Sequence, residues 1–245
     1  MDFAEFTESG YRRALVAAKE RFSFEPFGTR CDGPHVLWRH DVDFSVHRAA
    51  RLARIEADEG VTTTYFFLLH SNFYNLLERS VTDLARGIVH DDRHRLGLHF
   101  DSSFYGSLDS VDALGEKVAT EAAFLADLLA APVEAFAFHN PGLVNDDLAF
   151  DAGEIGGLAN AYARSVKERY EYVSDSNGYW RFRRLLDVLE DPAVERAHVV
   201  THPEWWQAEP LSPRDRVVRC VEGRAARTLA EYDDDLLKAG RENIG

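Results

Sequence analysis

The chain has 245 residues, and 42 acidic against 28 basic side chains give it a formal net charge of -14. This acidity argues against nucleic acid or anionic membrane surfaces as partners, and no apolar run approaches the length of a membrane span. The acidic, amphipathic N-terminus is not a signal peptide, and the spacing of Cys31 and Cys220 demands no disulfide, so we expect a cytoplasmic protein.

Short apolar runs that end in polar residues alternate along the chain with amphipathic segments. The runs, which we interpret as buried strands, lie at 36–44, 62–70, 94–101, 134–140, 160–166, 170–178 and 197–206. The segments with helical periodicity lie at 4–22, 45–58, 73–87, 109–130, 181–192 and 213–239. This alternation predicts an α/β fold with a parallel sheet and crossover helices.

The number of strands favours a closed or nearly closed barrel over an open sheet. We expect one domain over residues 1–245, in which 1–34 form an N-terminal helix and lead-in and 207–245 end in a C-terminal helix. The oligomeric state is left open by these patterns.

The first strand pattern carries the clearest chemical signal. Its apolar residues stop at His40, Asp41 and Asp43. Side chains two apart on an extended strand point the same way, so Asp41 and Asp43 are expected to face one spot. Two carboxylates so placed repel each other unless a cation or a proton lies between them. A strand that simply becomes polar on entering solvent is the alternative.

Other strand patterns end in similar side chains. They contribute His70, His99, Asp101, His139 and His202. Because the carboxyl ends of parallel strands meet on one face of a barrel, we expect these groups to gather there. Histidine and carboxylate ligands suit a divalent cation, with Zn²⁺ favoured and Co²⁺, Ni²⁺ or Mn²⁺ as alternatives. A hydrogen-bonded core histidine is the alternative for each one taken singly.

The ordered motifs resemble those of the polysaccharide deacetylase superfamily, carbohydrate esterases with a distorted seven-stranded (β/α) barrel. The stretch RHDVD resembles the family motif TFDD, and the family's HxxxH motif corresponds to the strand with His99. The family motif RxPY appears as HNPG, and VTHPEWW resembles the final motif with its catalytic histidine. The resemblance covers roughly residues 35–206.

The resemblance implies a role for each matching residue. Asp41 would be the catalytic base, His202 the general acid, and Asp43 and His99 metal ligands. The second histidine of HxxxH is replaced by Ser103, so His139 or Asp101 would have to complete the site. The arginine that orients the base in the family is replaced in HNPG by His139 or Asn140.

Further residues are expected to bind substrate or to support the catalytic groups. These residues are His40, His70, Asp101, Asn140, Asp175, Trp180 and Trp205. The resemblance implies hydrolysis of a non-peptide C–N bond, foremost N-deacetylation of an amino sugar, with a small carbohydrate or amide as substrate. The changed motifs leave two alternatives: a carbohydrate-binding or regulatory relative without metal, and a hydrolase of a formamide or cyclic amide.

Overall fold

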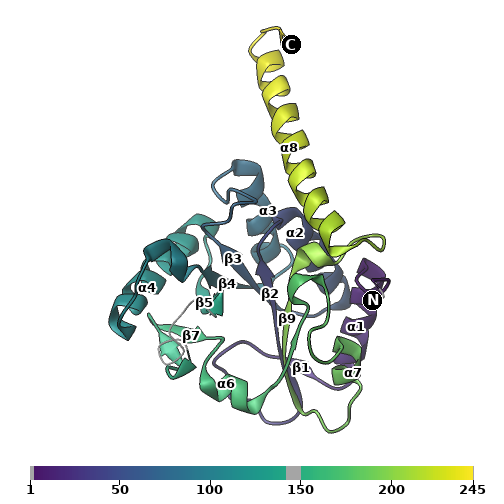
Figure 1. The fold of residues 1–245 in the computed structure, drawn as a ribbon, viewed down its shortest axis with the longest axis vertical. Coiled ribbons are helices and arrows are strands. Elements are labelled where there is room, and N and C mark those ends of the chain that lie inside the picture. Colours follow the sequence, from purple (N-terminus) through teal and green to yellow (C-terminus); the bar gives the residue numbers. More distant parts are fainter. Residues whose placement is uncertain (1–2, 142–149, 245) are drawn as a thin grey trace.

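Residues 3–141 and 150–244 are described by the computed structural model of the chain. Seven parallel strands form a curled sheet in the order β7-β5-β4-β3-β2-β9-β8, and the short β6 extends it antiparallel to β7 (Figure 1). The strands are β1 (Ser23–Phe24), β2 (His35–Val42), β3 (Thr64–Leu68), β4 (Arg95–Phe100), β5 (Val133–Phe138), β6 (Glu154–Ile155), β7 (Leu158–Asn160), β8 (Glu171–Ser174) and β9 (Arg196–Thr201). The predicted α/β class with a distorted, seven-stranded β/α barrel is confirmed.

Helices connect the parallel strands and cover the outside of the sheet. The longer ones are α1 (Glu8–Lys19), α2 (Val46–Glu59), α3 (Arg79–His90), α4 (Val111–Leu129) and α8 (Pro213–Lys238). The shorter ones are α6 (Arg164–Arg169), α7 (Leu185–Leu189) and the 3-10 turns η1 (Ser102–Tyr105), η3 (Ser176–Gly178) and η4 (Pro203–Trp205). None of the helices in the described residues is long and apolar enough to cross a membrane.

Local sequence explains where α2 begins and ends. The side chain of Ser45 accepts a hydrogen bond from the backbone N–H of Arg48, which satisfies a donor at the helix start. Gly60 ends the helix with φ of 70°, a conformation that favours glycine. The predicted helical segment, 45–58, therefore agrees with α2 to within one residue at each end. By contrast α3 begins at Arg79, later than the predicted residue 73.

The segment 160–166 was predicted to be a strand, and this is wrong. The strand β7 ends at Asn160, and α6 begins at Arg164. Tyr162 lies before α6 and Val166 lies within it, and both pack against the inner apolar cluster of the barrel.

The alternation of side chains along the strands divides the core into two layers. Even-numbered residues of β2, such as Val36 and Trp38, point outward to the covering helices, whereas Leu37 packs inside the barrel with Phe66 and Ala137. Gly97 of β4 lies against this inner layer, where an added Cβ would be 2.6 Å from the ring of Phe66. The inner cluster therefore forms an apolar floor beneath the carboxyl ends of the strands.

Candidate metal centre and active site

The odd-numbered residues at the end of β2 point into the barrel. Arg39, Asp41 and Asp43 follow Leu37 on this inner side, as the period of two residues requires. His40 lies on the other side of the strand, where its ring contacts Glu56 at 2.8 Å and Thr201 at 2.9 Å. The expectation that His40 supports the substrate pocket is therefore corrected: this side chain is fully buried behind the strand.

Three predicted ligand atoms form a small triangle above the apolar floor. Asp43 Oδ1 is 3.2 Å from His99 Nε2 and 3.3 Å from His139 Nδ1, and the two ring nitrogens are 3.2 Å apart. In the tetrahedral coordination typical of Zn²⁺, bonds of roughly 2.0–2.1 Å place neighbouring ligand atoms about 3.3 Å apart. The spacing of the three atoms therefore fits one face of such a site.

The protonation of His99 supports the same conclusion. Its Nδ1 lies 3.2 Å from the carbonyl oxygen of Ala137, which can only accept a hydrogen bond. In the neutral ring Nδ1 therefore carries the hydrogen, and Nε2 presents a lone pair to Asp43. Asp43 Oδ1 is buried without a hydrogen bond among the described residues. A carboxylate oxygen and an imidazole lone pair directed at one point need a cation or a proton between them, and a divalent metal would satisfy this donor set.

The electrostatics of the cluster follow from the same contacts. Burial would raise the pKa of Asp43, but the facing imidazoles of His139 and His99 outweigh burial and hold this pKa well below its usual value. Burial would lower the pKa of His139, but the nearby Asp43 carboxylate raises it overall. The carboxylate of Asp43 is thus kept ionised, which is the form that binds a cation.

Asp41 is oriented by Arg39, a residue that the motif comparison did not single out. A guanidinium nitrogen of Arg39 donates to Asp41 Oδ2 at 3.0 Å and to the hydroxyl of Tyr162 at 3.0 Å. The other carboxylate oxygen, Asp41 Oδ1, has no hydrogen-bond partner in the described residues. Asp41 also lines the cavity, so this oxygen is available to accept a proton there.

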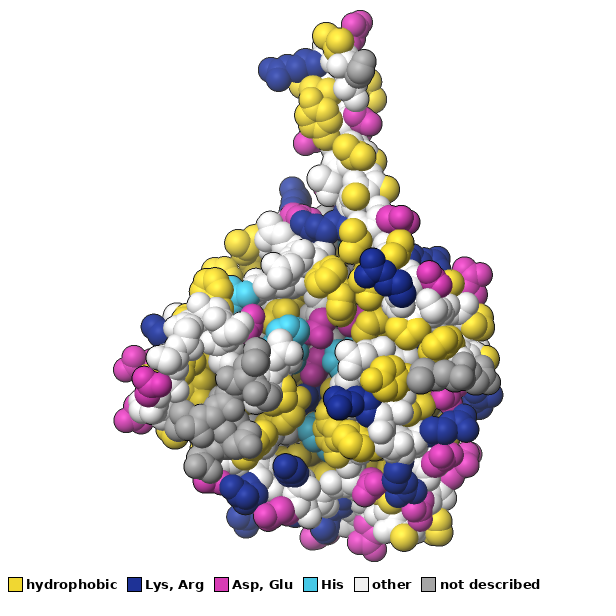
Figure 2. All heavy atoms as spheres, viewed as in Figure 1, with side chains coloured by type: hydrophobic (Ala, Val, Ile, Leu, Met, Phe, Trp, Pro, Cys, Tyr) yellow, Lys and Arg dark blue, Asp and Glu magenta, His cyan; other side chains and the backbone are white. Residues whose placement is uncertain are grey.

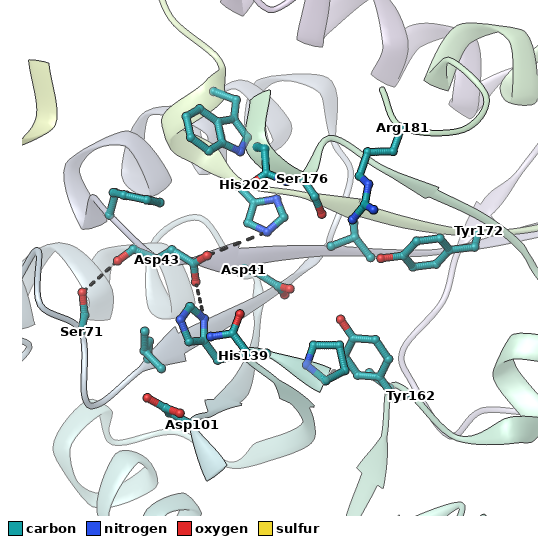
Figure 3. Close-up of a pocket in the computed structure, with 18 of the residues that line it drawn as sticks. Asp41, Asp43, Ser71, Asp101, His139, Tyr162, Tyr172, Ser176, Arg181 and His202 are labelled. Atoms are coloured by element: carbon teal, nitrogen blue, oxygen red, sulfur yellow. Dashed lines mark hydrogen bonds and ion pairs between the residues drawn. The ribbon is translucent and has the colours of Figure 1, made fainter. Parts of the chain in front are cut away.

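His202 is held by Asp175 on the opposite wall. Its Nδ1 is 2.6 Å from Asp175 Oδ1, and Asp175 also accepts a hydrogen bond from Trp206 Nε1 at 2.8 Å. Burial would lower the pKa of His202, but the hydrogen bond and charge of Asp175, helped by Asp43 and Asp41, raise it well above its usual value. The Nε2 of His202 lies 3.9 Å from Asp43 Oδ2 (Figure 3).

Asp41, Asp43, His139 and His202 line a cavity of about 890 Å³. In Figure 2 it appears as a hollow with histidine and acidic side chains inside and basic side chains around it. Its walls include Tyr162 and Tyr172, and the guanidinium of Arg181 points into it (Figure 3). Lys167 and Arg214 line the cavity as well. Among residues 3–141 and 150–244, neither they nor Arg181 have an ion-pair partner.

The remaining predicted pocket residues separate into two groups. His70, Asp101, Asn140 and Trp205 line the cavity. His70 contacts Glu121 at 3.0 Å, and Asp101 accepts hydrogen bonds from Ser103, so neither side chain joins the ligand triangle. Trp180 does not line the cavity, which corrects its expected role: its Nε1 donates to Glu5 and its ring stacks on Phe6.

No family model matches the chain, and no curated protein matches it. A search of solved structures finds a chitin deacetylase from Colletotrichum lindemuthianum (16% identity, TM-score 0.44), which covers 81% of this chain and 88% of that one. It also finds a family 4 carbohydrate esterase from Bacillus anthracis (14%, TM-score 0.40; 93% and 86%). A third match is a CE4 family pseudoenzyme mutant with restored enzymatic activity (12%, TM-score 0.46; 81% and 65%).

The matched structures share no more than 16% of their residues with this chain. The roles of its side chains therefore have to follow from its own geometry.

Proposed function

We propose that this protein is a metal-dependent hydrolase of a non-peptide amide bond, and that its substrate is an N-acetylated amino sugar. The observation that carries the proposal is the triangle of Asp43, His99 and His139, whose ligand atoms all lie within 4.8 Å of one another. A buried carboxylate and a raised-pKa histidine flank this triangle, as metal-assisted hydrolysis requires.

Asp43, His99 and His139 would hold the cation, and the cation would act as a Lewis acid on the amide carbonyl and on water. Asp41 would take a proton from the attacking water through its free Oδ1. Arg39 supports this role because its hydrogen bond to Asp41 Oδ2 orients the carboxylate and leaves Oδ1 for the water.

His202 would give a proton to the leaving nitrogen when the C–N bond breaks. Its raised pKa favours the protonated form near neutral pH, and Asp175 holds Nδ1 so that Nε2 faces the cavity. Water and the amide would thus be converted to acetate and a free amine. Asp41 would then be protonated and His202 neutral, and loss of a proton from Asp41 to solvent with uptake of one by His202 would restore both groups.

The cavity supports a substrate that combines a sugar ring with an anionic group. Aromatic walls such as Tyr162, Tyr172 and Trp205 suit the apolar faces of a ring. Lys167, Arg181 and Arg214 form no ion pair with the described residues, and they favour a phosphate or carboxylate on the same molecule. Soluble amino-sugar phosphates and nucleotide sugars meet both requirements.

To test this proposal, metal content and the rate of deacetylation are measured on the same preparations of wild type and variants. We expect wild type to retain about one divalent ion per chain, and His99→Ala to lose both the ion and the release of acetate from N-acetylglucosamine phosphates. His70→Ala is the matched control, because His70 lines the cavity but lies outside the triangle. It should keep its metal.

Absence of bound metal after addition of Zn²⁺, Co²⁺, Ni²⁺ or Mn²⁺ would overturn the hydrolase proposal. That outcome would favour the metal-free carbohydrate-binding relative. If the protein binds metal and releases no acetate, but releases formate or opens a cyclic amide, the hydrolase of a formamide or cyclic amide is favoured instead.

A further inference from the structure

Tyr162 lies on the short connection between β7 and α6 and lines the cavity of the candidate active site. Hydrogen bonds hold the backbone of this connection in place. The N–H of Tyr162 donates to Asn160 Oδ1 at 2.9 Å, and the N–H of Ala161 donates to the carbonyl oxygen of Phe136 on β5 at 3.0 Å. The position of the Tyr162 ring is therefore fixed by the sheet.

The hydroxyl of Tyr162 accepts a hydrogen bond from Arg39. The donor is the Nη2 nitrogen, 3.0 Å away, which also donates to Asp41 Oδ2. Because a guanidinium has no acceptor, the hydrogen of the Tyr162 hydroxyl takes no part in this contact. No residue in 3–141 or 150–244 accepts that hydrogen, so it is available to a molecule in the cavity.

Two properties of this hydroxyl make it a strong donor at neutral pH. Burial raises the pKa of Tyr162 above its usual value, although the charge of Arg39 opposes the shift, so the phenol keeps its hydrogen. The hydrogen bond that the hydroxyl accepts from a cation also polarises its O–H bond, which strengthens the hydrogen bond that it donates.

The hydroxyl lies within reach of an amide that is attacked beside Asp41. Tyr162 Oη and Asp41 Oδ2 are each 3.0 Å from the same nitrogen of Arg39, so they are at most twice this distance apart. In Figure 3 the hydroxyl points toward Asp41. One water molecule separates a base from the carbonyl carbon under attack, with contacts of about 3 Å on either side. A donor this close to the base can reach the carbonyl oxygen.

We propose that Tyr162 is a catalytic residue that donates a hydrogen bond to the carbonyl oxygen of the amide as this oxygen becomes negatively charged. The inference rests on the proposed function, hydrolysis of an amide between Asp41 and His202. When water adds to the carbonyl carbon, the π electrons of the C=O bond move to the oxygen, and Tyr162 stabilises this charge without giving up its hydrogen. The oxygen has several lone pairs, so this hydrogen bond and a bound cation can act on it together.

The first experiment removes the hydroxyl and keeps the ring beside Arg39. In Tyr162→Phe we expect kcat and kcat/KM for acetate release to fall together, about 10- to 100-fold, because the hydrogen bond strengthens only in the transition state. Metal content should match wild type, since Tyr162 lies outside the ligand triangle. Tyr170→Phe is the matched control. It removes a hydroxyl from another tyrosine of the cavity, one that lies 2.8 Å from His35 Nε2, and should leave both kinetic constants unchanged.

A second experiment, with 3-fluorotyrosine at position 162, tests whether the hydroxyl acts as a donor or only holds Arg39. Fluorine makes the phenol more acidic, so the hydroxyl becomes a stronger donor and a weaker acceptor. If Tyr162 donates to the reacting oxygen, kcat at neutral pH should be at least equal to that of wild type. If Tyr162 serves only as an acceptor for Arg39, kcat should fall.

The outcomes separate this inference from the proposed function. If wild type binds metal and releases acetate but Tyr162→Phe is equally active, the inference is wrong and the proposed function stands. A rise in KM alone would show that Tyr162 binds the sugar in the ground state, and loss of metal from Tyr162→Phe would show a structural role. Either result, or a lower kcat with 3-fluorotyrosine, overturns the catalytic role. If wild type itself releases no acetate, the proposed function fails and this inference fails with it.

Discussion

Substituting Asp175 by Asn tests whether this residue controls the proton on His202. The change keeps the size of the side chain but removes the charge 2.6 Å from His202 Nδ1. A hydrogen bond to a charged group contributes about 1.5–3 kcal/mol, and 1.36 kcal/mol corresponds to one pKa unit. Asp175→Asn should therefore lower the pKa of His202 by about one to two units.

The sign of the pH effect follows from the proposed role of His202 as the general acid. Its protonated form is active, so the rate falls as pH rises through the raised pKa of wild type. In Asp175→Asn this fall should begin about one to two pH units lower, and at pH values above the wild-type pKa kcat should be about 10- to 100-fold lower than in wild type. The same charge stabilises the fold below the unfolded pKa of about 6.5, and this contribution is lost as pH rises through the folded value.

The assay is the pH profile of acetate release, with metal content measured in parallel. Trp206→Phe is the control, since it removes only the hydrogen bond to the other carboxylate oxygen and keeps the charge of Asp175. In Trp206→Phe, the pH at which the rate falls should shift by less than it does in Asp175→Asn. If the rate of acetate release falls at the same alkaline pH in wild type and in Asp175→Asn, the assignment of His202 as the acid is refuted, whether or not kcat is reduced.

Three further predictions concern residues around this centre. Arg39→Met should leave metal content unchanged but lower kcat about 100-fold, because Asp41 loses the charge that orients it; parallel metal analysis and kinetics check this. Glu56→Gln should destabilise the fold by about 3 kcal/mol at pH 7, since the pKa of Glu56 is about 2, against an ordinary 4.5. Burial opposes this lowering and the charge of His40 causes it. This stabilisation is present above pH 4.5 and is lost as pH falls toward 2, which urea unfolding at several pH values would measure. Arg181→Glu should lower kcat/KM about tenfold or more for a sugar phosphate, and change it less than about threefold for the uncharged N-acetylglucosamine, in a direct comparison of the two substrates.

The strand ends could be predicted because two simple periodicities apply there. Alternation along β2 places Asp41 and Asp43 on one side, and parallel strands bring His99, His139 and His202 to the same end of the barrel. These rules need no knowledge of distances. They could not decide between His139 and Asp101 as the third ligand, because that choice depends on where each side chain points beyond its strand.

The register of two neighbouring strands explains how His139 reaches the triangle. His99 of β4 pairs with Ala137 of β5, so His139 lies two residues further along β5 and on the same inner side. Asp101 instead caps η1 through Ser103. Sequence patterns locate strands to within a few residues, whereas this result depends on a register exact to one residue.

The errors at His40 and Trp180 have different causes. His40 follows Arg39 and precedes Asp41, so alternation alone places it on the opposite side of β2, and the sequence contained the signal that corrects it. Trp180 was assigned to the pocket from its motif region, but it packs on Phe6 at the N-terminal edge of α1. That contact joins residues far apart in the chain, and no local pattern indicates it.

Arg39 shows how one function can be supplied from a new position. The resemblance placed the orienting cation after β5, and its absence there suggested a weakened site. What Asp41 requires is a donor and a positive charge near one carboxylate oxygen, and a residue two positions earlier on the same strand satisfies this requirement. The guanidinium is fully buried, with its charge facing the rings of Phe66 and Tyr162 as well as Asp41. A buried cation is tolerated only where such partners surround it, so the arrangement that orients Asp41 also accounts for an arginine inside the barrel.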